Sequence, residues 1–202
     1  MCSISRSFPT FTSMTLIKPS LVVVTGRPAS GKTTLSRALS QQIKYPLIAR
    51  DELKAGYINT FRSSPGGIAA NADIEVSETF FRTIELLIAG NISIIAEAAF
   101  QHKLWYPRLA PLIDKADIRM IICELSPQLA RERYISRMDA DPGREAFHRD
   151  SEELLKEAQN SLIDTYNAPE LPVPTLKVDT TVDYCPAMTG ILEFATTPAH
   201  FI

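Results

Sequence analysis

The stretch from Leu21 to Thr33 reads LVVVTGRPASGKT, and it decides how the rest of the chain is interpreted. Its first four residues are apolar and mostly β-branched, which favours a short buried strand. From Gly26 to Thr33 the residues fit the pattern G-x-x-x-x-G-K-[ST] in full. The glycines of such a loop allow a sharp turn in which backbone N–H groups approach phosphate oxygens. The stretch therefore predicts a strand, a phosphate-binding loop and the start of a helix.

The residues of this loop have separate expected roles. A helix that begins near Lys32 directs the positive end of its dipole at a bound phosphate. Lys32 would reach the β- and γ-phosphates of a nucleoside triphosphate, and the hydroxyl of Thr33 would ligate Mg²⁺. Such a pattern arises by chance in roughly one chain in a hundred of this length, so a loop that binds nothing is disfavoured. The predicted nucleotide-binding residues are Gly26, Arg27, Pro28, Ala29, Ser30, Gly31, Lys32, Thr33 and Thr34.

Apolar strand-like runs alternate with helical periodicity along the rest of the chain. Further strands are expected at 46–49, 92–96, 118–124 and 174–178, and helices at 33–43, 73–89, 127–138, 152–166 and 182–194. This alternation predicts an α/β fold with a parallel sheet covered by helices on both faces. The length of 202 residues suits one domain, expected at 20–202 after a flexible N-terminal extension at 1–19.

Composition excludes several classes of protein. The formal net charge of −2 argues against a large cationic surface for nucleic acid or acidic membranes. The three cysteines form no CxxC pair, so neither a disulfide framework nor a zinc site is expected, and Cys123 reads as a buried apolar residue. No apolar stretch approaches the ~18 residues of a membrane span, and residues 1–19 lack the core of a secretory signal. A cytoplasmic protein is expected.

Two carboxylates follow predicted strands, and ligands of parallel sheets bind beyond the carboxyl ends of the strands. Asp51 is placed to orient an acceptor hydroxyl and to accept its proton in a phosphoryl transfer. It is equally suited to cap a helix, and the two roles are compatible. Glu97 is placed to hold Mg²⁺ through water or to contact the acceptor, although a solvent-facing strand end is the alternative. Ala98, Ala99 and Phe100 suggest a pocket wall.

Arginines cluster in the segment after the fourth strand, at Arg131, Arg133, Arg137 and Arg144. Arg133 and Arg137 are four residues apart and share a helix face. A mobile lid at about 127–150 would bring such cations to a transferring phosphoryl group, while a solvated face balanced by nearby acids is the alternative.

Two polar features near the expected pocket each allow two interpretations. His148 is either structural or directed at phosphate or substrate. The turn of Asp179, Thr180 and Thr181 either borders a nucleobase pocket or caps the final helix.

Taken in order, six motifs resemble the P-loop kinases often labelled AAA family ATPases. They are GRPASGKTT at 26–34, RDELK at 50–54, IAEAAF at 95–100, the pair Arg133 and Arg137, the pair Arg144 and His148, and VDTT at 178–181. These kinases are similar to polynucleotide kinase, zeta toxin and chloramphenicol phosphotransferase, and the resemblance covers about residues 20–195. It implies a P-loop NTPase fold with a five-stranded parallel sheet, and phosphorylation of a hydroxyl group. Asp51 matches the acceptor-activating acid and Arg133 and Arg137 match the lid arginines, whereas Ala99 stands where members commonly have a polar residue, often Asn.

Together these features predict an ATP-dependent kinase that moves the γ-phosphoryl of Mg-ATP to a hydroxyl of a small molecule. The expected catalytic residues are Lys32, Asp51, Arg133 and Arg137, and the expected metal ligands are Thr33 and Glu97. The expected partners are ATP and a hydroxyl-bearing acceptor that the sequence does not identify. Two alternatives remain: a 5′-hydroxyl nucleic-acid kinase, and a nucleotide-dependent switch or ATPase that has no organic acceptor.

Overall fold

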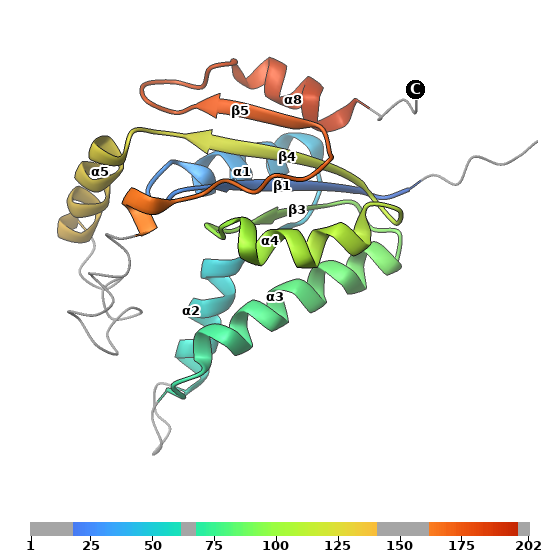
Figure 1. Ribbon diagram of the computed structural model, residues 1–202, viewed down its shortest axis with the longest axis horizontal. Coiled ribbons are helices and arrows are strands. Elements are labelled where there is room, and N and C mark those ends of the chain that lie inside the picture. The colour runs from blue at the N-terminus through green and yellow to red at the C-terminus, as the bar shows by residue number, and fades with distance from the viewer. Residues whose placement is uncertain (1–17, 62–67, 141–161, 198–202) are drawn as a thin grey trace, which may run out of the picture.

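The computed structural model describes residues 18–61, 68–140 and 162–197 (Figure 1). In that part of the chain, strands and helices follow in the order β1 (Ser20–Gly26), α1 (Lys32–Ile43), β2 (Leu47–Ala49), α2 (Arg50–Phe61), α3 (Ala72–Ala89), β3 (Ile94–Glu97), α4 (His102–Leu109), a 3₁₀ turn (Ala110–Leu112), β4 (Asp117–Glu124), α5 (Pro127–Ala140), β5 (Thr175–Asp179) and α8 (Met188–Thr196). Residues 162–165 form one further helical turn.

The five described strands form one parallel sheet with the order β2-β3-β1-β4-β5. This confirms the expected α/β P-loop fold. Strand β1 lies in the middle, and its residue Val24 pairs with Glu97 of β3 while Gly26 pairs with Cys123 of β4. Because parallel strands share one carboxyl edge, the loop that follows Gly26 lies at the centre of that edge. The sheet topology thus brings Glu97 beside the predicted phosphate loop.

The sheet has an apolar core on each face because side chains alternate along a strand. On one face, Leu21 and Val23 pack with residues of α3 and α4. On the other face, Val22 and Val24 pack with residues of α1 and α8. Figure 1 shows these two helical layers on either side of the strands. Burial on both faces explains why β1 and β4 read as continuous apolar runs.

An aromatic cluster anchors the end of β1 that leads into the phosphate loop. Phe80, Phe81, Phe100 and Trp105 pack with ring centroids 5.3 to 5.8 Å apart. The indole N–H of Trp105 donates to the hydroxyl of Thr25 over 3.1 Å, and that hydroxyl donates to the carbonyl of Ala98 over 2.9 Å. All of these groups are buried. Thr25 therefore connects β1, the strand end at Ala98 and the aromatic core directly before Gly26.

Replacing Thr25 by Val is expected to lower the free energy of unfolding by about 1–3 kcal/mol, because the buried Trp105 N–H loses its acceptor while the shape of the side chain is kept. Denaturant titration measures the difference. Thr79→Val on the exposed face of α3 is the matched control, since its hydroxyl bonds only the preceding turn of its own helix, and a change within about 0.5 kcal/mol is expected there. Equal losses in the two variants would contradict the anchoring role.

Most expected elements are found within a few residues, and three expectations need correction. The last helix begins at Met188, not at residue 182, because Pro186 lacks an N–H and disfavours helical backbone at the residue before it. Helix α4 was not expected, since it is short and has Pro107 inside. Helix α2 runs for 12 residues from Arg50 and was not among the expected helix ranges, although Asp51 was considered suited to cap a helix.

Several expectations fall wholly or partly outside the described residues. Of the N-terminal extension at 1–19, residues 1–17 lie outside, while Pro19 is buried and its carbonyl accepts a hydrogen bond from the N–H of Asp117 over 2.9 Å. Of the lid at 127–150, the part up to 140 is α5, and the part with Arg144 and His148 lies outside. Of the helix expected at 152–166, only the turn at 162–165 is described. Within the described residues, no helix is both long and apolar enough to cross a membrane.

Candidate active site

The loop between β1 and α1 has the backbone geometry of a phosphate cradle. Gly26 and Gly31 have φ angles of 148° and 82°, which L-residues rarely adopt. A Cβ atom on Gly26 would lie 2.5 Å from the carbonyl oxygen of Cys123, so only glycine fits there. Gly31 precedes α1 and has no side chain to cap the free N–H groups of the first helical turn. A phosphate group fits these donors.

Lys32 and Thr180 complete the cradle. Lys32 is almost fully buried, and its ammonium donates to the carbonyl of Arg27 over 3.0 Å, which places its positive charge across the loop. The buried hydroxyl of Thr180 lies 2.9 Å from the carbonyl oxygen of Ser30 and 3.0 Å from that of Glu124. Thr180 therefore joins the loop to the ends of β4 and β5, and a nucleoside triphosphate fits the rigid cationic loop that results.

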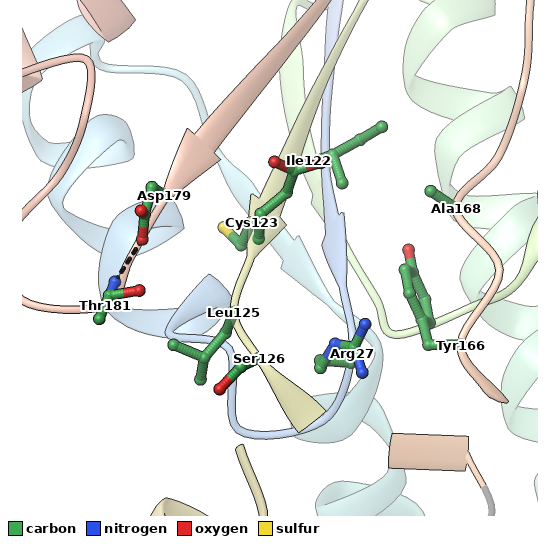
Figure 2. Close-up of a pocket in the computed structure, with 10 residues that line it drawn as sticks. Arg27, Ile122, Cys123, Leu125, Ser126, Tyr166, Ala168, Asp179 and Thr181 are labelled. Carbon is green, nitrogen blue, oxygen red and sulfur yellow. Dashed lines mark hydrogen bonds between the residues drawn. The ribbon is translucent and has the colours of Figure 1, made fainter. Parts of the chain in front are cut away.

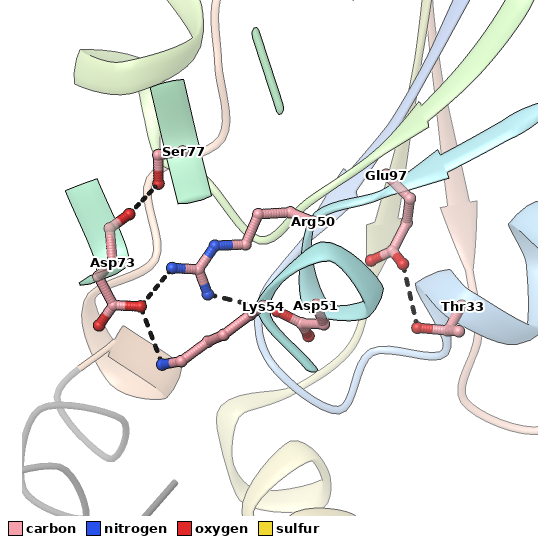
Figure 3. A network of polar contacts seen from close by, with 7 residues as sticks. All are labelled: Thr33, Arg50, Asp51, Lys54, Asp73, Ser77 and Glu97. Carbon is pink, nitrogen blue, oxygen red and sulfur yellow. Dashed lines mark hydrogen bonds and ion pairs between the residues drawn. The ribbon is translucent and has the colours of Figure 1, made fainter. Parts of the chain in front are cut away.

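Glu97 and Thr33 form the candidate metal site. Glu97 is 2% exposed, so the alternative of a solvent-facing carboxylate is wrong. The hydroxyl of Thr33 donates to Oε2 of Glu97 over 3.2 Å (Figure 3). Burial raises the pKa of Glu97, while the positive charge of Lys32 acts in the opposite direction. A divalent cation would offset the same cost of burial, and carboxylate and hydroxyl oxygens suit Mg²⁺. The residues present thus fit a magnesium ion.

Asp51 lies in the first turn of α2, where an acidic side chain is favoured by the helix dipole. Because α2 begins at Arg50, Asp51 is inside the helix, and the alternative that it is the N-cap is wrong. Its side chain is 67% exposed and lines a cavity of about 300 Å³. The same cavity is lined by most of the phosphate loop, namely Pro28, Ala29, Gly31, Lys32, Thr33 and Thr34.

The two arginines expected to act from the lid differ in position. Arg137 of α5 lines the cavity together with Tyr134 of the same helix. Arg133 instead donates to the carbonyl of Thr181 over 2.7 Å, which ties α5 to the segment after β5. Arg131 pairs with Asp164. The structure therefore places Arg137 in the wall of the cavity that the phosphate loop also lines, whereas Arg133 connects α5 to the segment after β5.

A family model described as an AAA domain matches residues 21–162, which run from β1 to the helical turn after the lid segment. This chain belongs to the AAA domain family. The expected resemblance to P-loop kinases of the AAA type is thereby confirmed.

Three solved structures are similar to this chain. A presumed kinase from Chloroflexus aurantiacus J-10-fl is 27% identical, with a TM-score of 0.73 over 91% of this chain and 100% of that chain. A gluconokinase from Sinorhizobium meliloti 1021 is 18% identical, with a TM-score of 0.52 over 88% of this chain and 89% of that chain. A sugar kinase from Janibacter sp. HTCC2649 is 13% identical, with a TM-score of 0.54 over 89% and 93%. The last two likenesses show the fold alone. A comparison with curated proteins finds no match.

The cavity is also lined by residues to which the sequence analysis gave no role. Arg50 and Lys54 of α2 line the cavity beside Asp51, and both contact Asp73 of α3 (Figure 3). Their spacing of four residues directly after a strand is the signal that could have drawn attention to them. Asp73 is distant in sequence, so its part in the site has no local signal.

A second cavity of about 410 Å³ adjoins the loop through Arg27 (Figure 2). Cys123 and Tyr166 line it, and burial raises the pKa of each to about 12. The Cys123 thiol is therefore protonated at neutral pH, as expected of a buried apolar residue, and it supplies no thiolate nucleophile.

Asp179 lines the same second cavity, and its carboxylate accepts the N–H of Thr181 over 2.7 Å. It caps this turn and not the final helix, which begins at Met188, so that alternative is wrong. That Asp179, Thr180 and Thr181 border a nucleobase remains a prediction.

Proposed function

We propose that this AAA domain protein is a Mg-ATP-dependent kinase that phosphorylates a hydroxyl group of a small molecule. One observation carries the proposal: a single cavity joins the phosphate loop, the carboxylate of Asp51 and the guanidinium of Arg137. Its volume of about 300 Å³ suits a small ligand. The likeness to a presumed kinase over nearly the whole chain supports the same conclusion.

The cradle residues bind and orient the phosphates. Bound Mg-ATP supplies the phosphoryl group. Lys32 and the first-turn N–H groups of α1 stabilise negative charge on the phosphates, and Thr33 and Glu97 would hold the metal. Because Thr180 and the aromatic cluster fix both ends of the loop, these donors are positioned before the ligand arrives.

The other cavity walls act on the acceptor. Asp51 orients the acceptor hydroxyl and accepts its proton as the oxygen attacks. Arg137 places a positive charge where negative charge increases in the transition state. Phe100 and Ala99 provide an apolar wall that limits the water around the reacting groups.

The test of this proposal is a panel of hydroxyl acceptors incubated with γ-labelled ATP and Mg²⁺, with the products identified by mass. Label is expected on a small-molecule hydroxyl. The panel includes a 5′-hydroxyl oligonucleotide, and label on that acceptor alone would instead establish a nucleic-acid kinase. Tight nucleotide binding without label on any acceptor would favour a switch and contradict the proposal.

Replacing Arg137 by Ala is expected to lower kcat more than it raises KM for ATP, because the cation acts mainly on the transition state. Loss of such a group typically costs a few kcal/mol of transition-state stabilisation. Steady-state kinetics separates the two parameters. Arg131→Ala on the same helix is the control, since Arg131 pairs with Asp164 outside the cavity and should retain wild-type kinetics. A change in KM alone would place Arg137 in ground-state nucleotide binding.

A further inference from the structure

Two cations of α2 form the wall of the cavity next to Asp51. Arg50 and Lys54 are one helical turn apart, so both project from one side of the helix. Their side chains are only 16% and 15% exposed. Arg50 also lies against the ring of Phe100, with its guanidinium carbon 5.9 Å from the ring centroid. These contacts hold two positive charges beside Asp51, and both side chains are largely shielded from water.

The carboxylate of Asp73 forms ion pairs with both of these cations. Oδ1 of Asp73 lies 2.6 Å from Nη2 of Arg50 and 2.8 Å from Nζ of Lys54 (Figure 3). Asp73 belongs to α3 and does not line the cavity. Partial burial acts to raise the pKa of Asp73, but Lys54 and Arg50 together lower it, so the carboxylate is ionised. One negative charge thus faces two positive charges.

Arg50 keeps unused capacity to donate. Its Nε atom is buried and has no hydrogen-bond partner among the described residues. Its contact with Asp51 is long, at 3.5 Å. A guanidinium presents its donors in a planar fork that matches the oxygens of a carboxylate or phosphate. The guanidinium of Arg50 therefore has N–H donors beyond the one that Asp73 engages.

The charges of the residues that line the cavity are unbalanced in the same direction. Its described lining carries four cationic side chains against the one carboxylate of Asp51. The phosphates of the proposed nucleotide would pair with Lys32 and Arg137. The two cations of α2 then remain for another anionic group.

We propose that the acceptor carries an anionic oxyacid group, a carboxylate or a phosphate, that binds to Arg50 and Lys54 while its hydroxyl lies at Asp51. This inference rests on the proposed kinase function and adds the class of substrate. The acceptor oxygen gains the phosphoryl group, ADP leaves with the bonding electrons, and Asp51 takes the proton. Because Asp51 and Arg50 are adjacent, the acid group and the hydroxyl belong to one compact molecule. A neutral analogue offers these cations no negative charge, so it binds more weakly and is rejected.

Thermal melting tests this binding without turnover. The wild-type protein, saturated with Mg²⁺ and a non-hydrolysable ATP analogue so that the cradle is filled, is titrated with gluconate, with sorbitol and with inorganic phosphate. Gluconate and sorbitol differ only in a carboxylate that replaces a hydroxymethyl group. A rise in melting temperature is expected with at least one of the two anions and not with sorbitol. The more effective anion distinguishes a carboxylate from a phosphate as the recognised group.

Arg50→Gln and Lys54→Gln are each expected to raise the half-saturating anion concentration by at least about tenfold. Arg108→Gln is a closely matched control, because Arg108 also pairs with an acid of α3, Glu78, and lies over an aromatic ring, that of Phe81, yet is outside the cavity. It should respond as the wild type does. Should Arg50→Gln fail to fold, Lys54→Gln carries the comparison.

The inference is overturned if the variants and the wild type respond equally to the anions, or if sorbitol is as effective as the anions. The absence of stabilisation by either anion has the same consequence. Failure of the nucleotide analogue to stabilise the wild type would instead contradict the proposed kinase function, so the two failures are distinguishable.

Discussion

Replacing Lys32 by Ala is expected to reduce acceptor-dependent turnover by at least about 10²–10³-fold and to weaken nucleotide binding. Lys32 is almost fully buried and its ammonium lies across the phosphate loop, where its charge is less screened than it would be in water. Alanine is a good helix former at the start of α1, so the fold should persist. Calorimetry with ATP and Mg²⁺ measures the binding, and steady-state assays measure the turnover.

Arg37→Ala is the matched control for this variant. Arg37 belongs to the same helix and carries the same charge, but it is exposed and pairs with Glu52 away from the cavity. Its loss should leave nucleotide affinity and turnover within about twofold of the wild type. Equal nucleotide affinity in the wild type and in Lys32→Ala would contradict the assignment of the cradle.

Replacing Asp51 by Asn is expected to slow phosphoryl transfer by about 10²–10⁴-fold with little effect on ATP affinity. Asparagine keeps the size of the side chain and can still accept a hydrogen bond, but it cannot take a proton as a carboxylate can. Asp51 is exposed in the first turn of α2, so the stability of the fold should change little. Single-turnover kinetics at saturating ATP isolates the transfer step.

Glu52→Gln tests whether the slower transfer expected of Asp51→Asn depends on the position of the lost carboxylate or only on the loss of one negative charge. Glu52 is the next residue in the same helical turn and is also exposed, but it pairs with Arg37 and does not line the cavity. Transfer by Glu52→Gln is expected to match the wild type. Undiminished transfer in Asp51→Asn would end the assignment of Asp51 as the proton acceptor and leave it with a helix-dipole role alone.

The phosphate cradle could be predicted from the sequence because its geometry is local. Gly26 and Gly31 are required by the backbone of their own turn, and Lys32 and Thr33 follow at the start of the same helix. The parallel sheet could also be predicted, because strands buried on both faces are continuously apolar. From the sheet alone, Glu97 could be placed at the carboxyl edge beside the loop.

The remainder of the site depends on contacts between residues distant in sequence. Asp73 meets Arg50 across 23 positions, and Thr180 meets Ser30 across 150. Neither pair has a local pattern, because the meeting depends on how α3 packs on α2 and where β5 joins the sheet. The burial of Glu97 was likewise undecidable from a strand end that could face either water or the cavity.

The central claim is that the cradle transfers a phosphoryl group to an organic hydroxyl and does not merely hydrolyse ATP. The measurement that tests it most directly is the ratio of phosphorylated acceptor to ADP formed by the wild-type protein, with an active acceptor from the hydroxyl panel and with free phosphate counted in parallel. The account predicts a ratio near one and little free phosphate. ADP matched by free phosphate, with no phosphorylated product from any acceptor, would contradict it.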